Sequence, residues 1–176
     1  VGSAAIQVAK AAGARVIAGT SSTAKCELAL RLGADDAFDY STGKLRERVK
    51  ELTGGKGPDV VYDPVGGPLA EAAFRAIAWR GRYLVIGFAQ GQIPALPLNL
   101  ALLKGASLVG VFWGEYARRE PQDNARMLAE LATWYAQGLV KPSIDQVLAM
   151  TELPAAFDLM DQRRVHGKLV LRNTRG

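Results

Sequence analysis

The chain alternates between short apolar runs and longer segments in which apolar residues recur at helical spacing. Apolar runs of about five residues predict strands, and they occupy 15–19, 37–40, 59–63, 82–87, 107–112 and 168–171, with a further one near Val147. The helical spacing predicts a helix capped by Ser3, and further helices over 23–32, 44–52, 68–78, 122–137 and 154–161.

Strands that alternate with helices of this length are typical of βαβ units, which build parallel sheets. Right-handed crossovers then place helices on both faces of the sheet. The pattern therefore predicts the α/β class with a doubly wound parallel sheet. The alternation weakens after Gly138, so we expect residues 1–138 and 139–176 to be structurally distinct.

The composition narrows the class further. With 176 residues, 49% hydrophobic and 22% charged, the chain has the size and apolar content of one ordinary domain, which excludes disordered, collagen-like and coiled-coil proteins. No apolar run approaches the roughly 18 residues of a membrane span. Cys26 is the single cysteine, so no disulfide framework forms, and the sequence lacks a signal-peptide start. We therefore expect a cytoplasmic protein without a membrane partner.

The positive charge is spread evenly along the chain. The net charge of +5 results from 22 basic and 17 acidic side chains. Of these, 12 basic and 9 acidic side chains lie in the first 88 residues. The basic residues at 44, 46, 48 and 50 are interrupted by Glu47 and followed by Glu51, a pattern typical of a solvated helix face. We therefore expect no nucleic-acid partner.

Two places carry candidate cofactor chemistry. Gly2 precedes a helix that opens with small residues, which lets backbone N–H groups face a phosphate; close helix packing explains this start equally well. About 18 residues on, the loop Thr20–Lys25 has hydroxyls and a lysine but no acid before Glu27. Such a loop accommodates the 2′-phosphate of NADP, whereas an acid there favours NAD. Helix capping by a hydroxyl and a solvated lysine is the alternative.

Other catalytic constellations are not supported. Cys26 and His166 are the only soft metal ligands, too few for a zinc site. Asp59 and Asp63 lie at opposite ends of one predicted strand, about 13 Å apart, too far for a retaining carboxylate pair. Neither Ser3 nor Ser107 lies in a Gly-x-Ser-x-Gly elbow.

Six ordered blocks together carry a family resemblance. They are VGSAAIQVAK (1–10), LGAD (32–35), TGGKGPDVVYDPVGG (53–67), GRYLVIGFA (81–89), LKGASLVGVFWG (103–114) and HGKLVL (166–171). On them the chain resembles the C-terminal part of a medium-chain dehydrogenase/reductase, in the zinc-free NADPH:quinone oxidoreductase branch. The resemblance implies a Rossmann domain over 1–138 that binds NADP, and a segment over 139–176 that returns to a catalytic domain.

The resemblance also implies residues for the adenosine and pyrophosphate end of the cofactor. Val1 and Gly2 match the last residues of the glycine-rich turn, whose backbone lies against the pyrophosphate. The 2′-phosphate loop is matched by Ser21, Ser22 and Lys25. Tyr40 matches a residue near the adenosine, and a half-exposed aromatic at a strand end is the alternative for it.

The nicotinamide end is matched by residues that follow later strands. Val65 and Gly66 match the backbone at the nicotinamide ribose, and Gly87 with Phe88 match the nicotinamide wall. Phe112, together with Trp113, matches the end of the sixth strand near the same place, with packing or a subunit contact as the alternative. Lys168 either reaches the cofactor or is a surface strand residue. No catalytic residue is assigned.

The family places the first strand of its nucleotide fold directly before the glycine-rich turn, at the centre of the sheet. We therefore expect a gap or a non-native closure between the strands at 15–19 and 59–63, and no reductase activity from the 176 residues alone. The resemblance implies hydride transfer from NADPH to a quinone. The alternatives are reduction of α,β-unsaturated carbonyls and a non-catalytic member that senses NADPH or binds nucleic acid. It also implies a homodimer through the edge strand 107–112.

Overall fold

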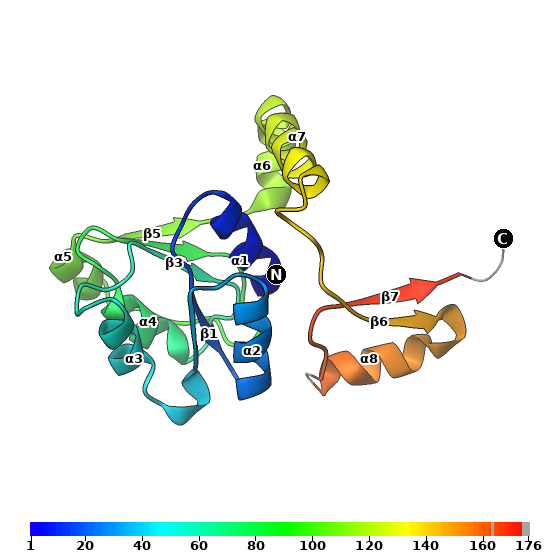
Figure 1. Cartoon of the computed structure of the whole chain (residues 1–176). Coiled ribbons are helices and arrows are strands. Elements are labelled where there is room, and N and C mark those ends of the chain that lie inside the picture. The colour runs from blue at the N-terminus through cyan, green and yellow to red at the C-terminus, as the bar shows by residue number, and fades with distance from the viewer. Residues whose placement is uncertain (163, 174–176) are drawn as a thin grey trace.

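The computed structural model describes residues 1–162 and 164–173. Its strands are β1 (Ile17–Thr20), β2 (Asp36–Asp39), β3 (Val60–Asp63), β4 (Arg82–Val85), β5 (Ser107–Gly110), β6 (Ile144–Ala149) and β7 (Lys168–Arg172). The helices are α1 (Gly2–Ala11), α2 (Thr23–Arg31), α3 (Leu45–Leu52), α4 (Leu69–Ala76), α5 (Asn99–Lys104), α6 (Trp113–Arg119), α7 (Pro121–Ala136) and α8 (Leu153–Asp161). Figure 1 shows their arrangement.

All described strand pairs are parallel. β1 pairs with β2, and β3, β4 and β5 form a second sheet in that order. The registers join Ile17 to Asp36 in the first sheet and Val60 to Arg82 in the second. Strand–helix alternation with parallel pairing confirms the predicted Rossmann-like α/β class.

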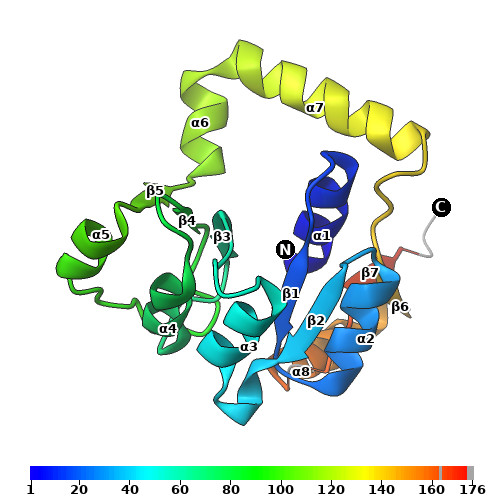
Figure 2. The same cartoon turned by 60° about the vertical axis from the view of Figure 1, so that its left-hand side comes forward.

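The sheet is divided between β1 and β3. Within the described residues these two strands do not pair, and they belong to separate sheets. Figure 2 shows β1 with β2 on one side and β3 with β4 and β5 on the other. The expected gap at this position is confirmed, and the alternative of a direct closure is wrong.

The main hydrophobic core lies under the three-stranded sheet. It comprises Ala70, Phe74, Ile77, Tyr83 and Leu100, all at most 5% exposed. The rings of Phe74 in α4 and Tyr83 in β4 pack with centroids 5.7 Å apart. This contact fixes α4 beneath β3 and β4, because both partners are buried large side chains.

One glycine is required for this packing. Gly57 has φ +85°, and a Cβ there would lie 2.2 Å from the carbonyl oxygen of Ala76 at the end of α4. Only glycine tolerates both this backbone conformation and this approach. Gly57 therefore lets the chain enter β3 directly beside α4.

The C-terminal residues form a smaller unit from β6, α8 and β7, with β6 and β7 parallel. Figure 1 shows it to one side of the larger sheets. Ala156 is its one buried hydrophobic residue among those described. The connection after α7 is held to α1, because the backbone N–H of Lys141 donates to the buried Gln7 side chain at 2.6 Å.

Two expectations about element ends are wrong. Val1, not Ser3, precedes α1, and the Val1 carbonyl accepts from the Ala5 N–H at 3.1 Å, so the helix begins earlier. The strand expected over 107–112 ends at Gly110, opposite Val85, where its partner β4 also ends. Trp113 then begins α6, which the apolar pattern did not predict.

Candidate functional site

The start of α1 has the chemistry of an anion-binding site. Among the described residues no side chain caps it, and its first turn contains no acid. Lys168, the first residue of β7, lies within electrostatic range of the Val1 nitrogen. Free N–H groups of a helix start beside a lysine suit a phosphate. Val1, Gly2 and Lys168 therefore form one end of the candidate site.

The loop after β1 contains Ser21, Ser22 and Lys25, which were predicted to bind the 2′-phosphate. Ser22 caps α2, and its Oγ accepts from the Lys25 N–H at 3.4 Å. The Lys25 Nζ donates to the Ser21 Oγ at 3.2 Å. The capping role proposed as the alternative for this loop is thus present, and a hydroxyl and an ammonium still face one another beside it. The pair has the chemistry of a phosphate site.

Tyr40 lies next to the same strand. It opens a single 3₁₀ turn, Tyr40–Thr42, directly after β2. A Cβ added at Gly19 in β1 would lie 3.6 Å from Tyr40 Cδ1 and 3.2 Å from Phe38 Cζ. The Tyr40 ring therefore lies against the end of β1, immediately before the Ser21–Lys25 loop.

Two turns after β3 and β4 are joined to each other. The Ala89 N–H donates to the Pro64 carbonyl at 3.1 Å, and the Gln90 N–H donates to the Val65 carbonyl at 3.0 Å. Gly66 has φ +66°, and a Cβ there would lie 2.9 Å from Phe88 Cδ1. The structure thus brings Val65 and Gly66 together with Phe88 and its neighbour Gly87.

Asp63 organises the first of these turns. Its Oδ1 accepts the N–H groups of Val65 at 2.8 Å and Gly66 at 3.0 Å. Its Oδ2 accepts the hydroxyl of Tyr83 from the neighbouring strand. Burial, followed by the hydrogen bond to Asp63 and its negative charge, raises the pKa of Tyr83 well above its usual value.

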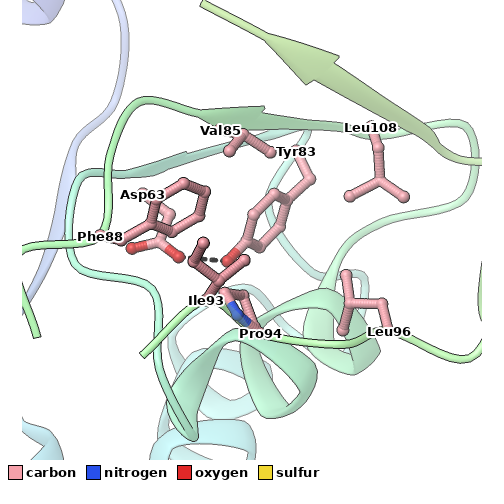
Figure 3. A pocket seen from close by; sticks show the side chains of 8 residues that line it. All are labelled: Asp63, Tyr83, Val85, Phe88, Ile93, Pro94, Leu96 and Leu108. Atoms are coloured by element: carbon pink, nitrogen blue, oxygen red, sulfur yellow. Dashed lines mark hydrogen bonds between the residues drawn. The ribbon is translucent and has the colours of Figure 1, made fainter. Parts of the chain in front are cut away.

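A cavity of about 260 Å³ lies beside this pair. Figure 3 shows the Tyr83 hydroxyl directed at Asp63, with Phe88 next to the carboxylate. The walls are otherwise apolar and come from β4, β5 and the loop that precedes α5, at Val85, Ile93, Pro94, Leu96 and Leu108. The polar end of the cavity is therefore this pair, which lies next to the two joined turns.

Phe112 behaves differently from the other predicted residues. It precedes α6 and is 76% exposed, and Trp113 is 58% exposed. The structure thus places it after β5 on the surface. Sequence reasoning missed the roles of Asp63 and Tyr83. The available signal was a tyrosine at the core-facing position of a strand, two residues before Val85, on the strand beside Asp63.

Neither a metal centre nor a membrane segment is built from the described residues. Residues 1–162 and 164–173 contain no group of three His, Cys, Asp or Glu able to hold a metal ion. Cys26 instead lies 3.0 Å from the Thr20 hydroxyl. No helix in the described part of the chain is long and apolar enough to cross a membrane.

Known proteins resemble the chain over most of its length. A family model for the zinc-binding dehydrogenases matches residues 1–133. Quinone oxidoreductase-like protein 2 of Bos taurus is 39% identical over 158 residues, which cover 90% of this chain and 45% of the relative. The chain therefore spans about half the length of such relatives.

Solved structures agree. Quinone oxidoreductase of Pseudomonas syringae pv. Tomato DC3000 gives a TM-score of 0.85 at 34% identity, covering 97% of this chain and 53% of that one. Mycobacterial Rv1454c complexed with NADPH gives 0.87 at 27% identity, covering 97% and 54%. CurK enoyl reductase gives 0.83 at 27% identity, covering 98% and 51%. The chain belongs to the zinc-binding dehydrogenase family of the medium-chain dehydrogenase/reductase superfamily, as a relative of the quinone oxidoreductases that the resemblance predicted.

Proposed function

We propose that this chain is the cofactor-binding portion of an oxidoreductase that transfers hydride from NADPH to a quinone. One observation carries the proposal. Most candidate residues follow parallel strands at their carboxyl ends, where doubly wound sheets bind dinucleotides, and the backbone matches an NADPH-complexed structure with a TM-score of 0.87. These residues are Ser21, Ser22, Lys25, Tyr40, Val65, Gly66, Gly87, Phe88 and Phe112.

Under this proposal, different residues of the chain bind different parts of the cofactor. The N–H groups at the start of α1, with Lys168, bind the pyrophosphate. Ser21, Ser22 and Lys25 bind the 2′-phosphate, and Tyr40 lies at the adenosine. The absence of an acid from the loop before Glu27 favours NADPH over NADH.

The turns at Val65–Gly66 and Gly87–Phe88 orient the nicotinamide, and Phe112 lies toward the same end. NADPH supplies a hydride, which with one solvent proton converts a quinone to a hydroquinone and leaves NADP⁺. The protein contributes position and electrostatics to this chemistry. We propose that this transfer needs no metal ion.

The alternative acceptor is an α,β-unsaturated carbonyl. The likeness to CurK enoyl reductase favours it. The second alternative is a non-catalytic protein that senses NADPH or binds nucleic acid. The even charge distribution argues against nucleic acid.

The test is NADPH oxidation by the full-length protein, with a benzoquinone and with an enone as acceptors. We expect tight NADPH binding and faster turnover with the quinone. Faster turnover with the enone would show that the acceptor is an α,β-unsaturated carbonyl and not a quinone. Binding without turnover of either acceptor would favour the sensor, and absence of NADPH binding would contradict all three.

We further propose that residues 1–138 are a Rossmann domain completed by a central strand outside these 176 residues. Residues 139–176 then associate with a catalytic domain. The divided sheet and the half-length coverage of relatives support this. The 176 residues alone should show no NADPH-dependent quinone turnover, and measurable turnover would contradict the proposal.

The proposed protein is a cytoplasmic homodimer that pairs through β5. This strand is an edge of its sheet, and the apolar residues Leu108, Val109 and Val111 are exposed on and after it. An exposed apolar edge strand is adhesive. Light scattering should give a dimer for the full-length protein and a monomer for Val109→Lys. A monomer for the wild-type protein would contradict the proposed dimer.

A further inference from the structure

Asp63 accepts hydrogen bonds on both of its oxygens. Oδ1 takes the N–H groups of Val65 and Gly66, and Oδ2 takes the Tyr83 hydroxyl. The two oxygens therefore connect the turn after β3 to the side chain of a residue in the middle of β4. Figure 3 shows the bond between Asp63 and Tyr83. Hydrogen bonds to a carboxylate are stronger than those between neutral groups.

The Tyr83 hydroxyl is separable from the packing of its ring. The ring packs against Phe74 in the main core and the residue is 2% exposed. A phenylalanine would keep this packing. It would leave one oxygen of Asp63 without its buried donor, which weakens the hold on the carboxylate.

The connection extends to the second turn. The turn braced by Asp63 accepts backbone hydrogen bonds from Ala89 and Gln90, and Gly66 lies close against the Phe88 ring. Displacement of Asp63 would therefore shift both turns together. A shift of about 1 Å at groups that orient a reacting ligand is costly in rate.

We propose that Tyr83 is a positioning residue for the nicotinamide end of the cofactor, acting through Asp63 on the Val65–Gly66 turn and on Phe88. The inference rests on the proposed NADPH-binding function. It predicts that the hydroxyl matters for the nicotinamide end and not for the adenosine end, since Ser21, Lys25 and Tyr40 follow strands of the other sheet.

The test compares two ligands in the full-length protein by calorimetry. NADPH has both ends, and 2′-phospho-ADP-ribose lacks the nicotinamide. Tyr83→Phe should weaken NADPH binding about fivefold to tenfold, raise KM for NADPH by a similar factor, and leave the affinity for 2′-phospho-ADP-ribose unchanged. Tyr135→Phe is the matched control, because Tyr135 lies on α7 with 62% of its surface exposed; it should change neither affinity.

Asp63→Asn is the second variant, and it tests the positioning role if Tyr83→Phe does not fold. It keeps the shape of the side chain but removes the charge, and should weaken NADPH selectively by a smaller factor. Unchanged NADPH affinity in the folded variant that is tested would overturn the positioning role alone. An equal loss of affinity for NADPH and for 2′-phospho-ADP-ribose would do the same. A wild-type protein that binds neither ligand would overturn the proposed function as well.

Discussion

The two halves of the divided sheet are stabilised by different means. The β3–β4–β5 half lies on a contiguous core in which Phe74 and Ile77 are at most 1% exposed. Among the described residues, the buried hydrophobic residues of the β1–β2 half are Phe38 and the small Ala29 and Ala34. It adds surface ion pairs, with Lys10 2.8 Å from Asp35 and Arg15 2.8 Å from Asp36.

This difference separates the two ends of the proposed cofactor site. The turns at the nicotinamide end are attached to buried groups, so changes there act through the core. The loop at the adenosine end consists of surface side chains, so changes there act on the ligand directly. If the loop binds the 2′-phosphate as proposed, its surface side chains can be replaced with little loss of stability, and we expect such replacements to change the cofactor preference.

The largest expected effect tests the difference in cores. Phe74→Ala should lower the free energy of unfolding by about 3–5 kcal/mol, because it opens a cavity in the main cluster. Phe38→Ala in the other half should cost less, about 3 kcal/mol, at the lower end of the same range. Urea denaturation of the full-length protein measures both. As a control, Leu30→Ala in α2, where the residue is 48% exposed, should cost less than about 1 kcal/mol. An equal or larger loss for Phe38→Ala would contradict the comparison.

The next effect concerns the adenosine end. Lys25→Ala removes the ammonium beside Ser21 and should weaken NADPH binding about tenfold, while NADH binding and the melting temperature stay unchanged. Calorimetric titration with both cofactors measures this. Arg31→Ala, at the other end of α2, is the matched removal of a positive charge and should leave both affinities as they are. Equal losses for NADPH and NADH in Lys25→Ala would disprove the assignment.

The smallest effect concerns the surface ion pairs. The hydrogen bond from Lys10, helped by the Val16 N–H, holds the pKa of Asp35 below its usual value of 3.8. Because the folded-state pKa is lowered, the stabilisation is present above pH 3.8 and is lost as the pH falls through the folded-state value. Asp35→Asn should lower the melting temperature slightly at neutral pH, and the difference should vanish in acid. A difference that persists or grows in acid would contradict this linkage.

The strands were predictable because burial leaves a simple trace in the sequence. Each apolar run marks a strand to within about two residues, as with 59–63 against Val60–Asp63. α6 was missed because Phe112 and Trp113 continue the apolar run of β5, although pairing with β4 stops at Gly110. The end of a strand depends on its partner, which the local pattern does not contain.

The candidate site was predictable only in part. The residues at strand ends followed from the family resemblance, and the structure brings Gly66 against Phe88. The Tyr83–Asp63 contact was not predictable, because it joins residues 20 positions apart on neighbouring strands. Alternation indicates that a side chain faces the core, but not which carboxylate it meets there.

The central claim is that one cofactor spans both halves of the sheet. Amide hydrogen exchange of the full-length protein, with and without NADPH, tests it most directly. We predict that NADPH protects amides in 21–25 and in both turns at 64–67 and 87–90, while those of α8 keep their rates. Protection confined to one half, or none at either, would contradict the account.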